Sequence, residues 1–148
     1  MKYKLSKRSL KKLNGVDDRL ASVVKRAIEI TKQDISVICG MRTIEEQKKL
    51  LAEGKTQTLN SNHLEGLAVD LAAYNDGISW RIEDYFAIYE AMREAAIELD
   101  VRIRGGLYWL APANSTKASG KELMDIYIAT RKSQGRKPFV DAVHFELH

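Results

Sequence analysis

Apolar residues recur at helical spacing in two long stretches of the chain. The first predicts a helix from Asp17, as its N-cap, to about Thr31. Its core-facing residues are Leu20, Val23, Val24, Ala27 and Ile28. The second predicts a helix from Ser79, as its N-cap, to about Leu99. Its core-facing residues are Ile82, Phe86, Tyr89, Met92, Ala96 and Leu99.

Capping signals and short apolar runs complete the pattern. Thr43 with Glu46, and Ser119 with Glu122, form possible capping boxes that start helices ending at Gly54 and before Gly135. A short helix is expected over 7–13 and a loop over 55–62. Strands are predicted over 35–39, 67–71, 101–103 and 139–147. Helices and short strands without regular βαβ alternation favour an α+β fold.

The composition suits one globular domain over 1–148, because 45% of the residues are hydrophobic and 30% are charged. No run approaches the ~18 apolar residues of a membrane helix, and no apolar core follows the N-terminal lysines as in a secretory signal. We therefore expect synthesis in the cytoplasm and no stable membrane association. Cys39 is the only cysteine, which excludes an intrachain disulfide, and it is expected to be a small buried hydrophobe.

Basic residues are concentrated at the N-terminus. Residues 1–16 carry six basic and no acidic side chains, whereas the rest of the chain carries 18 basic and 20 acidic ones. This segment is expected to be either a solvated helix face or a surface that attracts anionic polymers of the cell wall. The remaining chain has no basic surplus and no nucleic-acid-recognition motif, so no nucleic-acid partner is expected.

Histidines and acids form two clusters that can carry chemistry. Three histidines lie outside the predicted helices: His63, His144 and His148. A loop that turns at Gly66 brings His63 close to Asp70, seven positions later. Strand alternation places His144 and Glu146 on one face. Two histidines and one carboxylate are the ligand count of a catalytic zinc site. Dispersed surface or core histidines are the alternative interpretation.

Two motifs resemble those of the zinc D-alanyl-D-alanine peptidase superfamily. They are Ser61-x-His63-x-x-Gly66-x-Ala68-x-Asp70 and Asp141-x-x-His144-x-Glu146. Within that superfamily the chain is most similar to the phage endolysins that are L-alanyl-D-glutamate endopeptidases. The likeness extends to Ile38-x-Gly40-x-Arg42-Thr43, with Gln47, and to Arg104-Gly105-Gly106 before Trp109. It implies a single compact α+β domain with a small antiparallel sheet flanked by helices.

The resemblance also implies roles for individual residues. It makes His63, Asp70 and His144 the ligands of one Zn²⁺ per chain, and Asp141 the general base. Arg42 would bind the carbonyl oxygen that becomes negatively charged, or it pairs with a surface carboxylate. Four further residues are candidates for substrate binding or for support of the site: Ser61, Gln47, Glu146 and Trp109. The alternatives are loop capping for Ser61 and Gln47, metal binding for Glu146 and core packing for Trp109.

The implied function is hydrolysis of the peptide stem of bacterial peptidoglycan, at the L-alanyl-D-glutamate bond, by a phage or prophage endolysin. The implied enzyme is a monomer released to the wall by a holin. The alternatives are a D-alanyl-D-alanine carboxypeptidase or dipeptidase, and a non-catalytic wall-binding protein of the same fold. Two departures from the family pattern are Leu107-Tyr108 before Trp109, and a longer stretch over 111–136, which we interpret as an insertion at the rim of the site.

Overall fold

A four-stranded antiparallel core sheet organises the molecule. The computed structural model describes residues 2–56 and 62–148. The strands are β1 (Ile35–Cys39), β2 (Ala68–Tyr74), β4 (Ile103–Gly106) and β5 (Asp141–Leu147), in the order β1-β2-β5-β4. A short strand, β3 (Ile78–Ser79), pairs with the end of β2. Asp70 of β2 lies opposite His144 of β5, so strand pairing alone brings two of the predicted site residues together.

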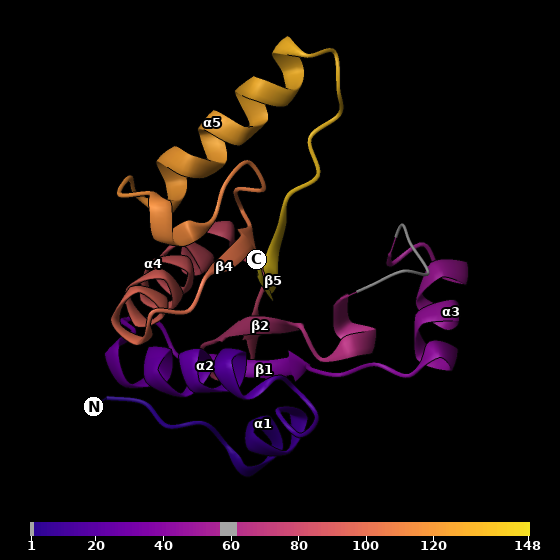
Figure 1. The fold of residues 1–148 in the computed structure, drawn as a ribbon, viewed down its shortest axis with the longest axis vertical. Coiled ribbons are helices and arrows are strands. Elements are labelled where there is room, and N and C mark those ends of the chain that lie inside the picture. The colour runs from indigo at the N-terminus through magenta and orange to yellow at the C-terminus, as the bar shows by residue number, and fades with distance from the viewer. Residues whose placement is uncertain (1, 57–61) are drawn as a thin grey trace.

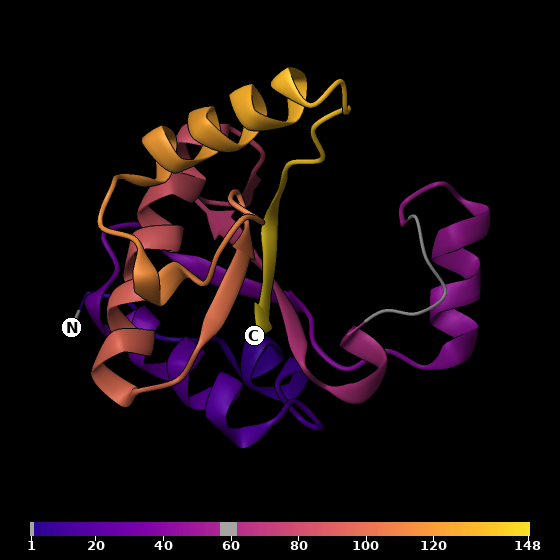
Figure 2. The same ribbon diagram turned by 45° about the horizontal axis from the view of Figure 1, so that its top comes forward.

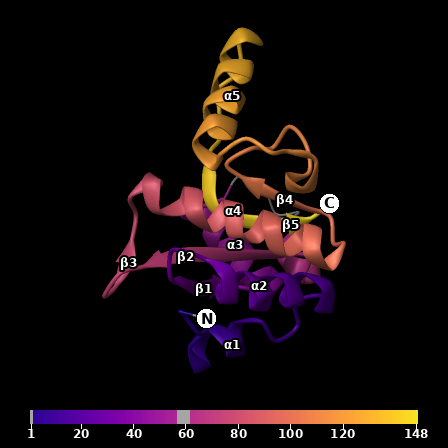
Figure 3. The ribbon, with the colours of Figure 1, turned by 90° about the vertical axis from the view of Figure 1, so that its left-hand side faces the viewer.

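Helices cover the two sides of this sheet unequally. Helices α2 (Asp18–Ile30) and α4 (Ile82–Leu99) pack against each other and cover one side (Figures 1 and 3). Helix α5 (Gly120–Ser133) packs on α4, and the chain returns from it into β5. Helix α3 (Ile44–Ala52) stands on the opposite side, away from the other helices (Figure 2). The functional side chains lie on this less covered side.

The helix predictions are largely confirmed. The five apolar residues predicted for the core face of α2 are all buried, and Asp17 caps that helix. Thr43 and Glu46 form the predicted capping box of α3, and Ser119 caps α5. For α4 the predicted set of core-facing residues is too small and partly wrong. Leu99 is exposed, whereas Tyr85, Ile88, Ala91 and Ala95 are buried, because α2, α5 and the sheet together surround much of the helix.

The predicted N-cap of α4 is wrong. The helix begins at Ile82 after Arg81, which makes no side-chain cap bond. Ser79 instead belongs to β3, where its hydroxyl donates to the carboxylate of Asp84 at 2.6 Å. This short strand, Ile78–Ser79, was not expected from the sequence. The Asn75-Asp76-Gly77 turn therefore joins β2 and β3 in a hairpin.

The strand that was predicted over 101–103 lies instead at Ile103–Gly106. Its two glycines are inside the strand because other groups approach their backbone closely. A Cβ on Gly105 would lie 2.8 Å from the Tyr89 ring, and one on Gly106 would lie 1.9 Å from the carbonyl oxygen of Asp141. The two glycines therefore permit this close packing.

Helix α1 (Lys7–Lys12) is held firmly against β1. Val37 of β1 donates its backbone N–H to the buried Ser9 hydroxyl, and Leu13 belongs to the core. The basic side chains of α1 remain exposed. In the part of the chain that the structure describes, no helix has both the length and the apolar character needed to cross a membrane.

Candidate metal and catalytic site

A cavity of about 740 Å³ lies between α3 with its following loop and strands β2, β4 and β5. Its size is within the range of about 300–1,000 Å³ that is usual for small-molecule sites. Seven of the residues predicted for the site line it or support its wall: Arg42, His63, Asp70, Trp109, Asp141, His144 and Glu146. The eighth, Gln47, is buried behind Arg42. Ser61 lies outside the described residues.

Asp70 is the centre of this group. Its Oδ1 atom lies 3.2 Å from His63 Nε2 and 3.4 Å from His144 Nδ1. The two rings approach edge to face, with centroids 5.2 Å apart. His63 comes from a short 3₁₀ helix (Asn62–Glu65), and the other two residues come from paired strands. Residues far apart in the chain thus direct two imidazole nitrogens at one carboxylate oxygen.

The outer nitrogen of each ring is held by an acceptor. His63 Nδ1 lies 2.8 Å from the carbonyl oxygen of Gly40, which can only accept, so Nδ1 carries a proton. His144 Nε2 lies 2.7 Å from Glu146 Oε1. These contacts leave His63 Nε2 and His144 Nδ1 as the nitrogens that face Asp70. Histidine ligands of metals are commonly oriented by such outer hydrogen bonds.

Burial and charge act in opposite directions on these groups. Burial lowers the pKa of His63, but hydrogen bonds with Asp70 and Cys39 and the Asp70 charge outweigh it and raise that pKa to about 10. Burial raises the pKa of Asp70, but the two histidines hold it well below its ordinary value. The pKa of His144 is raised in the same way by Asp70 and Glu146, against the effect of burial. The cluster therefore favours positive charge beside Asp70, whether carried by protons or by a cation.

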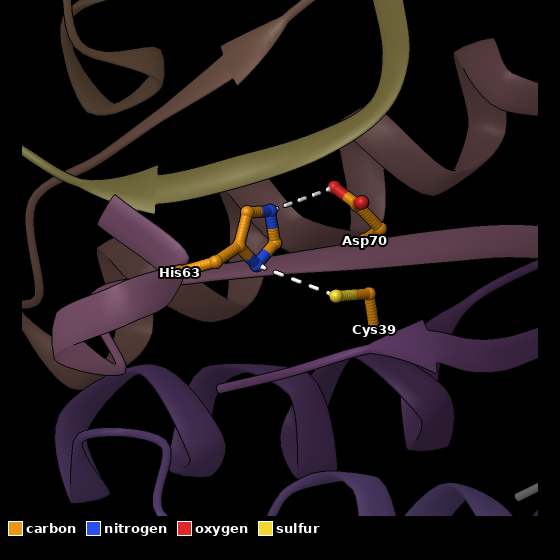
Figure 4. Close-up of side chains that lie close together, drawn as sticks. All are labelled: Cys39, His63 and Asp70. Carbon is orange, nitrogen blue, oxygen red and sulfur yellow. Dashed lines mark hydrogen bonds and ion pairs between the residues drawn. The ribbon is translucent and has the colours of Figure 1, made fainter. Parts of the chain in front are cut away.

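Cys39 is a further candidate ligand that the sequence interpretation missed. Cys39, His63 and Asp70 each offer a ligand atom within 4.8 Å of the others, so these three residues can hold a metal ion (Figure 4). Cys39 is only partly buried, and its sulfur lies 3.8 Å from His63 Nδ1. The expectation of a small buried hydrophobe was wrong in its burial, because the side chain is partly exposed. The bulge between Val37 and Cys39 turns it towards His63, and such an irregularity is not readable from alternation.

Arg42 is fixed beside Asp70. Its Nη2 donates to Asp70 Oδ2 at 3.2 Å, and its Nη1 donates to Gln47 Oε1 at 2.8 Å. Gln47 is completely buried and donates in turn to the Thr56 hydroxyl at 3.3 Å. The Arg42 backbone N–H donates to the carbonyl oxygen of His63. A guanidinium held at several points is a preorganised donor for developing negative charge.

Asp141 lines the same cavity at the start of β5. Its pKa is raised, first by burial and then by the negative charge of Asp70. Its strand position is fixed by Gly106, which lies opposite it in β4. A partly buried carboxylate with a raised pKa can accept and return a proton nearer neutral pH than an ordinary one.

We expect Gly106→Ala to impair activity strongly, although it adds only one methyl group. The new Cβ would meet the Asp141 carbonyl at 1.9 Å, so the start of β5 must shift and carry the Asp141 carboxylate with it. A misplacement of about 1 Å can cost on the order of 100-fold in rate. Gly135→Ala is the control, because nothing lies near its Cβ, although its positive φ adds local strain. Equal rates for both variants, with equal melting temperatures, would contradict this role of Gly106.

Arg104 is a functional candidate that the sequence interpretation did not single out. Its Nη2 donates to Glu146 Oε2 at 2.7 Å, and its Nη1 donates to the carbonyl oxygen of Trp109 at 3.3 Å. At the cavity wall, the Trp109 ring stacks with Phe139 and lies tilted against His144. The sequence placed Arg104 beside two glycines, but its pairing with Glu146 depends on strand register, which no local pattern reveals.

Comparisons with known proteins agree on one family. A family model described as phage L-alanyl-D-glutamate peptidase matches residues 1–127. The L-alanyl-D-glutamate peptidase of Escherichia phage T5 is 33% identical over 116 aligned residues, and the match covers 75% of this chain and 85% of that protein. The crystal structure of the Serratia marcescens L-Ala D-Glu endopeptidase ChiX has a TM-score of 0.72 at 28% identity, covering 99% of this chain and 92% of that one.

Proposed function

The chain belongs to the family of phage L-alanyl-D-glutamate peptidases, and on that premise we propose that its hydrolysis of peptidoglycan stems depends on one zinc ion held by His63, Asp70 and His144. The observation that carries this proposal is the convergence of two histidine nitrogens on one oxygen of Asp70.

The spacing of these atoms fits zinc. Zinc bonds to nitrogen and oxygen are about 2.0–2.2 Å long and tetrahedral, which places neighbouring ligand atoms about 3.3–3.5 Å apart. The two nitrogens lie 3.2 and 3.4 Å from Asp70 Oδ1. Three protein ligands leave a fourth position for water or substrate, as in catalytic zinc sites.

Cys39 fits this ion less well than His144 does. Its sulfur is near His63 Nδ1, the nitrogen whose proton is directed at the carbonyl oxygen of Gly40. The Nε2 atom, which carries the lone pair of the ring when Nδ1 is protonated, is on the other side of the ring and faces Asp70. We therefore favour His144 as the third ligand.

The chain's own residues divide the remaining work. When bound, zinc would polarise the scissile carbonyl and acidify a water molecule. Asp141 takes the proton of the attacking water and returns it to the leaving amine of D-glutamate. The Arg42 guanidinium stabilises the negative charge that develops on the carbonyl oxygen. Gln47 keeps Arg42 in place, and Glu146 keeps His144 in place, through the hydrogen bonds described above.

Product analysis on purified peptidoglycan tests the function as a whole. We expect new free carboxyl termini on L-alanine and new free amino termini on D-glutamate, formed in equal amounts. Addition of a chelator is expected to stop their formation, and zinc to restore it. Release of free D-alanine instead would support the dipeptidase or carboxypeptidase alternative. Equal hydrolysis by the metal-free enzyme would overturn the zinc proposal.

We also propose that the basic surface of α1 attracts anionic polymers of the cell wall. Four exposed cations of this helix line a second depression: Lys7, Arg8, Lys11 and Lys12. Among the described residues, Glu46 is the one acidic residue at the edge of this depression. Like charges four residues apart, as in Lys7 and Lys11, destabilise a helix by about 0.2–0.5 kcal/mol per pair. An anionic partner would relieve this repulsion.

The variant with both Lys7→Gln and Lys11→Gln is expected to lyse permeabilised cells with a weaker dependence on salt. Salt screens exposed charges over about 10 Å at 0.1 M, so the wild-type rate should fall as salt rises. The control variant, with Lys25→Gln and Lys132→Gln, loses the same charge from exposed positions on other helices. Identical salt profiles for the two double variants would contradict a special role for α1.

A further inference from the structure

A continuous chain of polar contacts connects Arg104 to the candidate metal site. Arg104 donates to Glu146 Oε2 at 2.7 Å, and the other oxygen of the same carboxylate lies 2.7 Å from His144 Nε2. The opposite nitrogen of His144 faces Asp70. Each link joins side chains that are mostly buried, since Glu146 is only 9% exposed and Arg104 is 32% exposed. Arg104 is thus connected to His144 through one intervening side chain, that of Glu146.

The backbone holds the two ends of the contact in register. Arg104 of β4 lies directly opposite Glu146 of β5, so their side chains extend from neighbouring strand positions on one face. Glu146 pairs in turn with Ala68 of β2, two positions before Asp70. The sheet therefore fixes the carboxylate between the guanidinium and the imidazole. Only the side-chain torsions of Glu146 remain to be set.

Arg104 is anchored on its other side by Trp109. The guanidinium lies 5.3 Å from the centre of the indole ring and donates to the Trp109 carbonyl oxygen. Arginine suits this place because its planar fork can donate in two directions while its face stacks on an aromatic ring. Trp109 itself lies near His144, with ring centroids 5.3 Å apart. Arg104 is therefore connected to the His144 imidazole both through Glu146 and through Trp109.

We propose that Arg104 is a positioning residue, which holds Glu146 so that His144 presents Nδ1 to the metal ion. This inference rests on the proposed zinc site. Without the guanidinium, Glu146 would be a mostly buried carboxylate that keeps His144 as its side-chain partner but loses the second contact that helps to fix its torsions. The acceptor that sets the orientation of His144 would then be less firmly placed.

Zinc affinity, measured by competition with a chromogenic chelator, tests the proposal without reference to activity. Arg104→Ala is expected to weaken zinc binding by up to about 10–100-fold, which is the usual effect of losing the direct outer partner of a ligand, here Glu146. Arg104→Lys is expected to recover part of this loss, because one ammonium group can reach Glu146 but cannot also bond Trp109. Arg102→Ala is the matched control, because it removes the same charge from an exposed site two residues away.

A double-mutant cycle shows whether Arg104 acts through Glu146. In a Glu146→Gln background, Arg104→Ala is expected to change zinc affinity by less than about twofold, because the link is already broken. Fully additive losses would overturn the proposal. So would unchanged zinc affinity in a folded Arg104→Ala variant, and a raised KM there would make Arg104 a substrate-binding residue instead. If Arg104→Ala does not fold, Arg104→Lys replaces it in the zinc titration and in the double-mutant cycle. Full wild-type zinc affinity in these lysine experiments would overturn the proposal equally.

The same titration separates this inference from the function on which it rests. Wild-type protein that binds one zinc per chain, with Arg104 variants that bind it equally well, refutes only the role of Arg104. Wild-type protein that binds no zinc refutes the metal site, and the role of Arg104 with it.

Discussion

His63→Ala is expected to abolish both zinc binding and hydrolysis. The side chain is 2% exposed, and its Nε2 is one of two nitrogens directed at Asp70. Loss of a ligand leaves two protein donors, too few to retain a catalytic zinc ion. Since a metal ion contributes several kcal/mol to stabilisation of the transition state, the rate should fall by more than about 100-fold. Metal analysis of the purified variant, with product assays, gives both quantities.

Thermal unfolding supplies an independent measure for this variant. Added zinc should raise the melting temperature of the wild type, because it binds only the folded chain, and should leave that of His63→Ala unchanged. His148→Ala is the control, since this histidine is exposed at the chain end. A folded His63→Ala protein with a full complement of zinc would show that the ligand set is different.

Asp141→Asn is expected to bind zinc normally and to lose turnover. The amide has nearly the same shape as the carboxylate but cannot accept the proton from water. Loss of a general base costs about 10²–10⁴-fold in rate. The loss should appear in kcat with little change in KM, because the proposed role of Asp141 is confined to proton transfer. Asp76→Asn, in the exposed β2–β3 turn, is the control.

Zinc content distinguishes the two possible roles of Asp141. Loss of the metal from Asp141→Asn would make Asp141 a ligand rather than a base. Retention of both zinc and full activity would assign proton transfer to another group of the cavity.

Much of the fold could be predicted because its signals are local. The α+β class, the antiparallel sheet and the peptidase family are confirmed, and the apolar face of α2 and the caps of α2, α3 and α5 follow the sequence closely. The errors concern features set by tertiary contacts. Gly105 and Gly106 lie inside β4 because neighbouring groups leave no room for a Cβ, and Ser79 joins a strand instead of capping α4.

The site shows the same division. The residues of the two motifs were identified from the sequence, and the structure brings His63, Asp70, Asp141 and His144 to one cavity. Their assignment as ligands and base stays a prediction. Arg104 and Cys39 were missed as partners of the site because their contacts depend on strand register and on a bulge. Neither feature leaves a local pattern in the sequence.

The most direct test is a crystal structure of the zinc-loaded protein with anomalous diffraction recorded on both sides of the zinc absorption edge. We predict a single anomalous peak within about 2.0–2.2 Å of His63 Nε2, Asp70 Oδ1 and His144 Nδ1. A peak bonded to the Cys39 sulfur, with His144 outside bonding distance, would contradict the account.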